Sequence, residues 1–323
     1  MVLPLLTIIG ATGNQGSSVL ASALESKQYR VRAITRNPTS ASAVKLLSQG
    51  IEVVSADLDD EASLIKAFED STAIFAMTNF FGYWPQTSAD EAMSIERQQG
   101  INLANAAMKT PTLQHYIWST LPNFGKITGG KLKVPHAFAK NQVDDYIKSH
   151  GKLLEKTTFL WCAFYAQNFA YPIFSPTFLK TAGKYVLLAP VPANTLVETI
   201  GDVSKNLGKF SSAILAQPEK TRSKIVLGSI ETTTMGGLLQ SWSEATGKES
   251  LYVELANIAE YDKLFPLWGD AEGLVFKFWE EQKDKSWIDL DGMEIITKEN
   301  LKLEKSDFVG VKEAVEGMDW SGL

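Results

Sequence analysis

The chain has 323 residues, a hydrophobic content of 45% and a formal net charge of −6. These values suit one large α/β unit, or a nucleotide-binding unit with a smaller partner unit, and they show no low-complexity tract. The negative charge, without any basic cluster, argues against direct binding of nucleic acid or of anionic membranes.

Histidine and cysteine are scarce in this chain. The three histidines, His115, His136 and His150, lack metal-ligand spacing, and the single cysteine, Cys162, lies in an apolar run. We therefore expect no metal site and no internal disulfide. A lone buried cysteine fits a reducing compartment, so we expect a cytoplasmic protein, with the nucleus as a second location. We expect no membrane span and no signal peptide, because no segment has the required apolar length or leader.

The first predicted strand and helix carry the most information. The apolar run Leu5–Ile9 leads into Gly10-x-x-Gly13-x-x-Gly16, and a helical pattern follows directly. In a parallel sheet, such a helix N-terminus receives the pyrophosphate of a dinucleotide. We expect Gly10 to make a tight turn, Gly13 to let phosphate approach the backbone, and Gly16 to let the helix pack closely on the strand.

The second predicted strand, Arg30–Arg36, ends without the Asp or Glu that holds the ribose 2′-hydroxyl of NAD. Arg36 stands there instead. Its planar guanidinium suits the 2′-phosphate of NADP(H), although an ordinary solvated arginine is the alternative. We therefore expect NADP(H) rather than NAD(H).

Further strands and helices alternate up to residue 164, with short connections between them. We expect strands at 51–57, 73–78, 115–120 and 157–164, and helices at 62–68, 91–108 and 135–149. This alternation predicts a Rossmann-type, doubly wound parallel sheet.

Beyond residue 164 the alternation weakens. The pattern predicts a loop region rich in proline and aromatic residues at 165–192, then a helix capped by Asp202 and a strand at 224–227. Another helix is expected after Thr232-Thr-Thr, with threonine as its cap and Gly247 as its stop, and a mostly helical tail is expected from residue 257 onward. We expect an NADP-binding Rossmann domain at 1–164 and a smaller mixed α/β substrate or partner subdomain at 165–323. Part of the second segment is expected to return to the Rossmann sheet.

Residues at the carboxyl ends of the strands are site candidates, because ligands of open α/β sheets bind there. Asp57 would lie near the adenine or, alternatively, cap a helix. In the aromatic segment 79–86, Phe81 and Trp84 would form an apolar wall for a substrate, with ordinary packing as the alternative.

Catalysis by hydride transfer to a carbonyl requires a positioned acid, because the product alkoxide needs a proton. Short-chain dehydrogenases use Tyr-x-x-x-Lys and a serine on the fifth strand, whereas this chain has His136-Ala-Phe-Ala-Lys140 and Ser119. His136 and Lys140 share one helix face. We expect Lys140 to hold ribose. His136 would either donate a proton when charged, despite the nearby lysine, or merely line the pocket.

These motifs resemble, in order and at similar spacing, those of the NmrA-like family, whose members are atypical relatives of the short-chain dehydrogenases and reductases. The similar segments cover about the first 170 residues; they are 10–16, 31–38, 78–79, 115–119, 136–146 and 165–168. Gln98 stands where a human relative has a cofactor-binding lysine, so one contact to a phosphate or ribose of the cofactor is left open.

The resemblance implies a set of cofactor-binding residues around the pyrophosphate, the 2′-phosphate, the adenine and the nicotinamide. They are Gly10, Ala11, Thr12, Gly13, Asn14, Gln15, Gly16, Arg36, Asn37, Ser40, Asp57, Leu58, Thr78, Asn79, Phe80, Lys140, Tyr165, Ala166, Gln167 and Asn168.

Two functions follow from the resemblance. The first is a redox-sensing regulator that binds NADP(H) and changes its conformation or its association with a protein partner. The second is an NADPH-dependent reductase of a hydrophobic carbonyl or activated C=C substrate, in fungal secondary metabolism. The missing tyrosine favours the first function. The catalytic candidates Ser119, His136 and Lys140, with the pocket residues Phe81, Trp84 and His136, favour the second.

Overall fold

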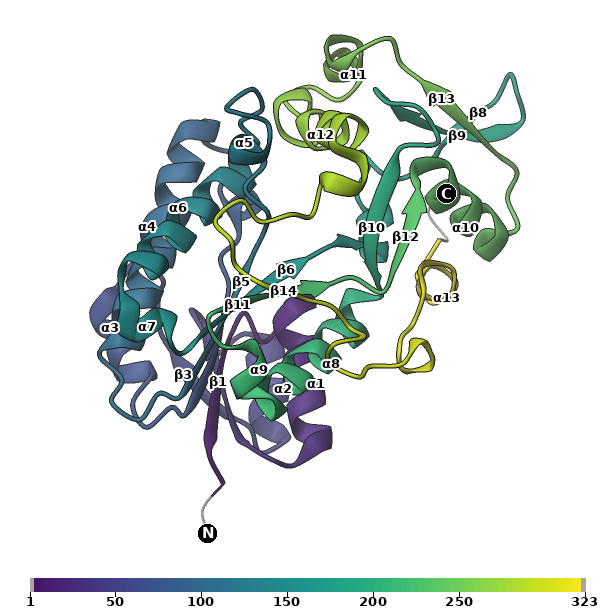
Figure 1. Ribbon diagram of the computed structural model, residues 1–323. Coiled ribbons are helices and arrows are strands. Elements are labelled where there is room, and N and C mark those ends of the chain that lie inside the picture. The colour runs from purple at the N-terminus through teal and green to yellow at the C-terminus, as the bar shows by residue number, and fades with distance from the viewer. Residues whose placement is uncertain (1–2, 321–323) are drawn as a thin grey trace.

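A computed structural model describes residues 3–320; residues 1–2 and 321–323, at the ends of the two expected units, lie outside the described part. The central sheet has eight strands, and every neighbouring pair is parallel (Figure 1). Their spatial order is β14 (Ile295–Ile296), β11 (Lys224–Gly228), β6 (Thr157–Cys162), β5 (His115–Thr120), β4 (Ala73–Ala76), β1 (Leu5–Ile9), β2 (Arg30–Thr35) and β3 (Glu52–Ser55).

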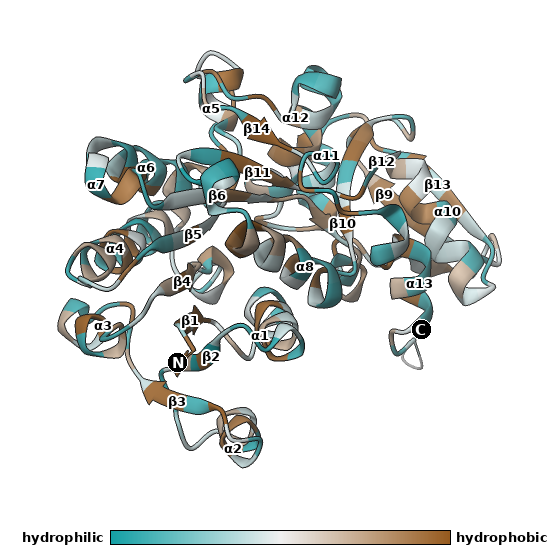
Figure 2. Ribbon diagram, turned by 60° about the horizontal axis from the view of Figure 1, so that its bottom comes forward, coloured by the Kyte–Doolittle hydropathy of each residue, from teal (hydrophilic) through white to brown (hydrophobic). Residues whose placement is uncertain are grey.

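Helices cover both faces of this sheet, which confirms the expected doubly wound Rossmann-type fold. Figure 2 shows α1 (Asn14–Ser26) and α8 (Val203–Ala216) on one side of the row of strands. On the other side lie α3 (Glu61–Ala67), α4 (Ala89–Met108) and α6 (Pro135–Ser149). Short helices complete the connections: α2 (Ala41–Ser48), α5 (Phe124–Ile127), α7 (Gly151–Leu154) and α9 (Pro218–Thr221).

The second half of the chain forms two small sheets beyond the carboxyl ends of the central strands (Figure 1). One has the order β12 (Glu231–Thr234), β10 (Leu196–Gly201) and β7 (Phe164–Tyr165). The other has the order β13 (Ser250–Glu254), β9 (Lys184–Ala189) and β8 (Thr177–Leu179). The helices of this part are α10 (Met235–Thr246), α11 (Ile258–Leu264), α12 (Leu274–Gln282) and α13 (Val311–Glu316), with a π-helix η3 (Gly269–Gly273) and 3-10 turns η2 (Ala166–Ala170), η4 (Lys283–Lys285) and η5 (Lys305–Asp307). A further 3-10 turn, η1 (Phe80–Gly82), follows β4 in the first half.

One local expectation for this second half was wrong, because the segment 165–192 is not only loop but contains β8 and β9. The helix expected after Thr232-Thr-Thr is confirmed, since Thr234 caps α10 and Gly247 ends it. β9 pairs with β13, which follows it by about sixty residues, and β12 pairs with β10. These strands depend on distant partners, so local periodicity does not reveal them.

Helix α8 lies unusually close to α1 through a seam of small residues. A Cβ atom added at Gly208 would stand 2.1 Å from the backbone oxygen of Ser18, and the Gly208 N–H donates to Ser18 Oγ at 2.8 Å. Ser22 and Ser212 meet through their hydroxyls at 2.7 Å. The second half of the chain thereby holds the helix that follows the glycine turn.

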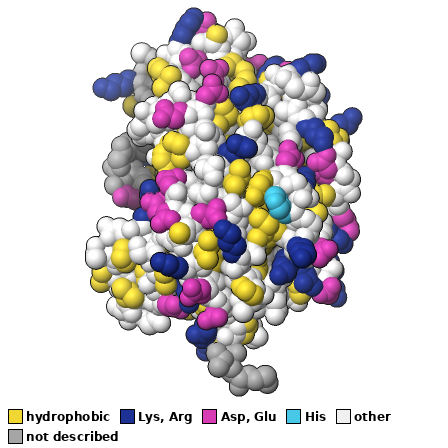
Figure 3. All heavy atoms as spheres, turned by 90° about the vertical axis from the view of Figure 1, so that its left-hand side faces the viewer, with side chains coloured by type: hydrophobic (Ala, Val, Ile, Leu, Met, Phe, Trp, Pro, Cys, Tyr) yellow, Lys and Arg dark blue, Asp and Glu magenta, His cyan; other side chains and the backbone are white. Residues whose placement is uncertain are grey.

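No helix within residues 3–320 combines the length and apolarity that crossing a bilayer demands. On the face that contains α3, α4 and α6, Figure 3 shows acidic and basic side chains interspersed rather than gathered into a broad basic surface.

We expect Gly208→Ala to destabilise the protein by about 1–3 kcal/mol, because the new methyl group would overlap the α1 backbone. Gly151→Ala is the matched control, since nothing lies within 4 Å of a Cβ atom at that position. Urea unfolding would measure both. Equal stability of the two variants would contradict the tight α1–α8 seam.

Candidate functional site

A cleft of about 390 Å³ opens at the carboxyl ends of β1, β2, β3 and β4. It brings together nine of the predicted cofactor residues: Gly10, Thr12, Arg36, Asn37, Ser40, Asp57, Leu58, Thr78 and Asn79. It is also lined by Met77 and Tyr83, which the sequence places at the end of a strand and in the aromatic segment. Sequence reasoning missed six further lining residues, namely Ile9, Ile34, Thr35, Ala56, Gly82 and Gln99.

The glycine turn leaves the N-terminus of α1 open. Gly10 has φ +69°, a backbone conformation that glycine adopts most readily. A Cβ atom at Gly16 would stand 2.2 Å from the Gly10 backbone oxygen, so only glycine lets the helix approach this closely. Gly13 caps the helix without a side chain, and the first turn contains no acid. The helix N-terminus can therefore receive an anion.

Arg36 lies at the opposite border of the cleft, directly after β2. Its side chain is exposed and forms no hydrogen bond or ion pair with any residue of the described chain. Ser40 caps α2, and Asp57 closes a turn by accepting from the Asp59 N–H at 3.1 Å. The alternative role considered for Asp57, capping of α3, belongs to Asp60.

Lys140 is held by a buried network. Its ammonium donates to Glu96 Oε1 at 2.8 Å, to Thr78 Oγ1 at 2.8 Å and to the Thr78 backbone oxygen at 3.0 Å. The three N–H donors are thus satisfied by protein. Any contact to ribose, as expected for Lys140, requires one of these bonds to be exchanged.

Glu96 is the partner that sequence reasoning missed. Its side chain is 0% exposed, and its Oε2 atom has no hydrogen-bond partner within the described residues. A usable signal was present, because Glu96 lies on the core-facing stripe of α4 with Ala92, Gly100 and Leu103. A glutamate on such a stripe needs a buried cation.

His136 lies against the aromatic rings of Phe80 and Phe81, with ring centroids 6.2 and 5.3 Å away. Its Nδ1 is buried without a hydrogen-bond partner inside the described chain. Burial, and then the charge of Lys140, lower the pKa of His136 to about 3. The imidazole is therefore neutral near pH 7, which excludes the charged proton donor considered from the sequence.

Ser119 contacts the glycine-rich segment rather than His136. Its hydroxyl donates to Gln15 Oε1 at 2.7 Å, and Gln15 Nε2 donates to the Tyr165 hydroxyl at 2.5 Å. Cys162 Sγ lies 3.6 Å from Ser119 Oγ, and burial raises the pKa of this thiol to about 11. Cys162 is therefore an unreactive, buried thiol.

The other predicted residues after β6 have mainly structural contacts. Gln167 Nε2 donates to Asp202 Oδ1 at 2.6 Å, and Gln167 Oε1 accepts from the Val203 N–H at 3.1 Å. Ala166 is buried, and Asn168 is half-buried. This segment thereby connects the edge of the site to the N-terminus of α8.

The aromatic segment after β4 forms a cluster with a distant part of the chain. Phe81 stacks on Trp268 at 5.8 Å, and Trp84 meets Trp268 edge-on at 4.7 Å. Phe80 and Trp84 are buried, whereas Phe81 is 39% exposed. Phe81, Trp84 and His136 therefore lie together as expected. Trp268, the residue directly before η3, completes the cluster and was not foreseen.

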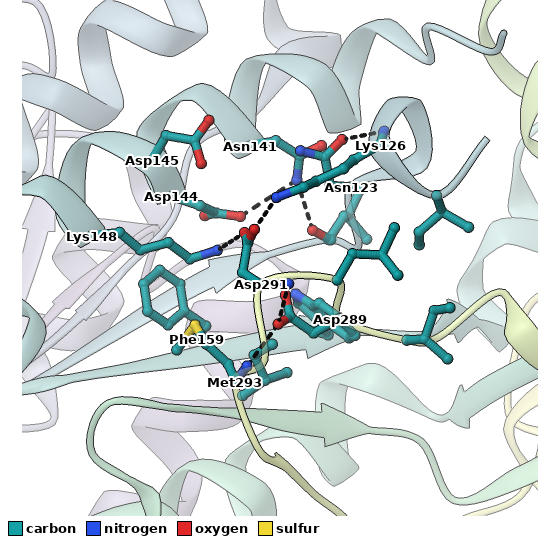
Figure 4. A pocket seen from close by; sticks show the side chains of 16 residues that line it. Asn123, Lys126, Asn141, Asp144, Asp145, Lys148, Phe159, Asp289, Asp291 and Met293 are labelled. Carbon is teal, nitrogen blue, oxygen red and sulfur yellow. Dashed lines mark hydrogen bonds and ion pairs between the residues drawn. The ribbon is translucent and has the colours of Figure 1, made fainter. Parts of the chain in front are cut away.

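A second cavity, of only about 20 Å³, lies between α5, α6 and the segment 288–293 (Figure 4). Asp291 from that segment bridges Lys126 and Lys148. Asp144 on α6 accepts hydrogen bonds from Trp118 Nε1 and Thr120 Oγ1, and burial raises the pKa of Asp144 to about 6. This volume holds about one water molecule, which is too little for a cofactor. The ion pairs of Asp291 attach the segment 288–293 to α5 and α6.

Within residues 3–320, no group of three or more His, Cys, Asp or Glu side chains could hold a metal ion.

We expect Lys140→Met to destabilise the protein by about 3–5 kcal/mol, because it leaves the Glu96 carboxylate buried without its cation. The double variant Lys140→Met/Glu96→Gln should recover most of that loss. Urea unfolding of both proteins would check this. An equal loss in the single and double variants would show that the ion pair is not the cause.

Comparison with known proteins supports one family. The model of the NmrA-like family matches residues 4–303. The NmrA-like family domain-containing oxidoreductase hkm9 of Aspergillus hancockii is 26% identical over 272 residues, which cover 80% of this chain and 77% of that protein.

Solved structures show the same fold. NmrA, a negative transcriptional regulator crystallised in complex with NADP, has a TM-score of 0.73 and 20% identity, covering 98% of this chain and 96% of that chain. The NADPH-dependent quinone oxidoreductase QOR2 from Escherichia coli, complexed with NADPH, has a TM-score of 0.68 and 18% identity, covering 96% and 98%. The chain therefore belongs to the NmrA-like family.

Proposed function

We propose that this protein binds NADP(H) in the cleft at the carboxyl ends of β1–β4. The observation that carries the proposal is a pair of anion-binding groups at two borders of one cleft: the N-terminus of α1, which no side chain caps, and the Arg36 guanidinium, which has no partner among residues 3–320. Relatives of the same fold were crystallised with NADP and NADPH.

The fit of the cofactor follows from the chemistry of the lining residues. The segment 10–16 would hold the pyrophosphate, while Arg36, Asn37 and Ser40 would hold the 2′-phosphate and its ribose. Asp57 and Leu58 would contact the adenine. The nicotinamide half would lie toward Thr78–Phe80, Lys140 and Tyr165–Asn168. No carboxylate at the end of β2 competes for the 2′-phosphate.

We expect Arg36→Ala to weaken NADPH binding roughly 10–100-fold and to leave NADH binding unchanged, because the lost charged hydrogen bonds involve only the 2′-phosphate. Fluorescence titration with each coenzyme would measure this. Arg30→Ala is the control, since Arg30 is the first residue of β2 and lies at the end of the strand away from Arg36. Wild-type NADPH affinity in Arg36→Ala would remove the assigned role of this residue.

We infer that the bound cofactor serves a reductase acting on a hydrophobic carbonyl or activated C=C substrate. When bound, NADPH would supply a hydride at the nicotinamide. His136 lies about one helical turn before Lys140 on α6 and belongs to a cluster with Phe81, Trp84 and Trp268. The aromatic rings of this cluster would contact a flat acceptor. The name oxidoreductase that relatives such as hkm9 carry is consistent with this use.

A redox-sensing regulator is the second candidate function. It is favoured by the neutral His136 and by the filled donors of Lys140, because neither group is a free acid at the position of Tyr-x-x-x-Lys. NmrA, which shares this fold, is described as a negative transcriptional regulator. In this function the protein would bind NADP(H) without turnover and change its association with a protein partner.

NADPH consumption with a panel of aromatic aldehydes, enones and quinones separates the two functions. The reductase predicts consumption, with a KM that rises roughly 3–10-fold in Phe81→Ala or Trp268→Ala because one aromatic contact is lost. Phe178→Ala, an exposed ring on β8, is the control. Tight NADPH binding without consumption of any acceptor would favour the regulator.

A further inference from the structure

We infer that Tyr165 delivers the proton that completes carbonyl reduction, with Gln15 and Ser119 as positioning residues. This inference rests on the proposed reductase function and adds its proton source. The three side chains come from three separate elements: the start of α1, the end of β5 and the segment after β6.

The three residues form one continuous chain of hydrogen bonds. The Ser119 hydroxyl donates to Gln15 Oε1 at 2.7 Å, so the amide is oriented with Nε2 toward Tyr165. Gln15 Nε2 then donates to the Tyr165 hydroxyl at 2.5 Å. The phenolic oxygen therefore accepts a hydrogen bond from Gln15, while its own proton faces the Cys162 thiol. Because a thiol sulfur is a weak acceptor, the hydroxyl can turn from it to a stronger one, such as an alkoxide.

The chain of hydrogen bonds lies beside the cleft, at the carboxyl ends of the central strands, and its three residues are not among those that line the cleft. Gln15 belongs to the first turn of α1, beside the place where the pyrophosphate would bind. Ser119 lies in β5 and Tyr165 in β7, directly after β6, on the side of β4 away from Arg36. An extended dinucleotide whose 2′-phosphate lies at Arg36 would therefore direct its nicotinamide toward Tyr165.

An amide takes the role that the lysine has beside the tyrosine of Tyr-x-x-x-Lys, because Lys140 is bound to Glu96 and Thr78. In Tyr-x-x-x-Lys, the lysine stabilises the phenolate that remains after proton transfer. Here the Gln15 N–H has that role, because a hydrogen bond to a phenolate is stronger than one to a neutral phenol. Burial raises the pKa of Tyr165 well above its usual range, and the Gln15 bond lowers it in part. The hydroxyl thus stays protonated until an alkoxide, a stronger base, forms beside it.

The step balances in atoms and charge. The carbonyl carbon accepts the hydride that bound NADPH supplies, and the π electron pair moves to the carbonyl oxygen. The Tyr165 O–H bond breaks as the new alcohol O–H bond forms. The phenolate, stabilised by Gln15, then takes a proton from water, to which Tyr165 is partly accessible.

Other groups near the site are poorer donors. His136 is neutral, and all three donors of Lys140 are bound to Thr78 and Glu96. Quinone reduction has a different demand, because the hydroquinone anion is a weak base that water can protonate. The role of Tyr165 should therefore appear with aldehydes and not with quinones.

The test compares Tyr165→Phe with the wild-type protein on two acceptors, p-nitrobenzaldehyde and menadione. We expect the kcat for the aldehyde to fall roughly 100-fold or more and the kcat for menadione to fall much less. Tyr185→Phe, on β9 in the second small sheet, is the control. An unchanged aldehyde rate in Tyr165→Phe, or an equal loss with both acceptors, would overturn the inference.

A second measurement does not depend on turnover. In protein with isotope-labelled tyrosine, the NMR resonance of the hydroxyl-bearing ring carbon of Tyr165 can be assigned by its absence in Tyr165→Phe. We expect Gln15→Met to shift this resonance and to slow aldehyde reduction more than menadione reduction. An unshifted resonance would overturn the positioning role of Gln15, even if the protein is a reductase.

Failure of the proposed function has a separate signature. If the wild-type protein binds NADPH but reduces neither acceptor, the reductase function fails, and proton delivery by Tyr165 is overturned with it. If aldehyde reduction is present but insensitive to Tyr165→Phe, the reductase function stands and only the proton source is wrong.

Discussion

The close approach of α1 to the turn after β1 is the constraint on which the cleft depends. Gly16 leaves no room for a Cβ atom against the Gly10 backbone oxygen, and Gly208 leaves none between α8 and Ser18. Helix α1 is therefore held by the turn after β1 on one side and by α8 on the other. Its N-terminus stays open between them, so the anion-binding end is built by backbone packing more than by side chains.

Charge is distributed unevenly along the site. Arg36 is an exposed and unpaired cation at one border, while the cation of Lys140 is neutralised by Glu96 inside the protein. Beyond Lys140 the surroundings become aromatic, with Phe81 and Trp268 stacked above a neutral His136. A ligand that is anionic at one end and flat and uncharged at the other matches this gradient.

Most of the first half could be predicted from the sequence, because each of its strands and helices has a recognisable local sequence pattern. The glycine turn, the β-branched strand Arg30–Thr35 and the helix Pro135–Ser149 each combine periodicity with clear end signals. The small sheets were not foreseen, since β9 and β12 are defined by partners far along the chain. Trp268 and Glu96 were missed for the same reason: each acquires its role only from a contact across the fold. Ser119 was selected by its strand position, but its contact with Gln15 could not be read from spacing.

The central claim is that the cleft binds NADP(H) in the orientation set by α1 and Arg36. A crystal structure of the protein with NADP⁺ tests it most directly. The account predicts the pyrophosphate on the first turn of α1, the 2′-phosphate on Arg36 and the nicotinamide near Tyr165. An empty cleft at saturating coenzyme, or a coenzyme bound in the reverse direction, would contradict it.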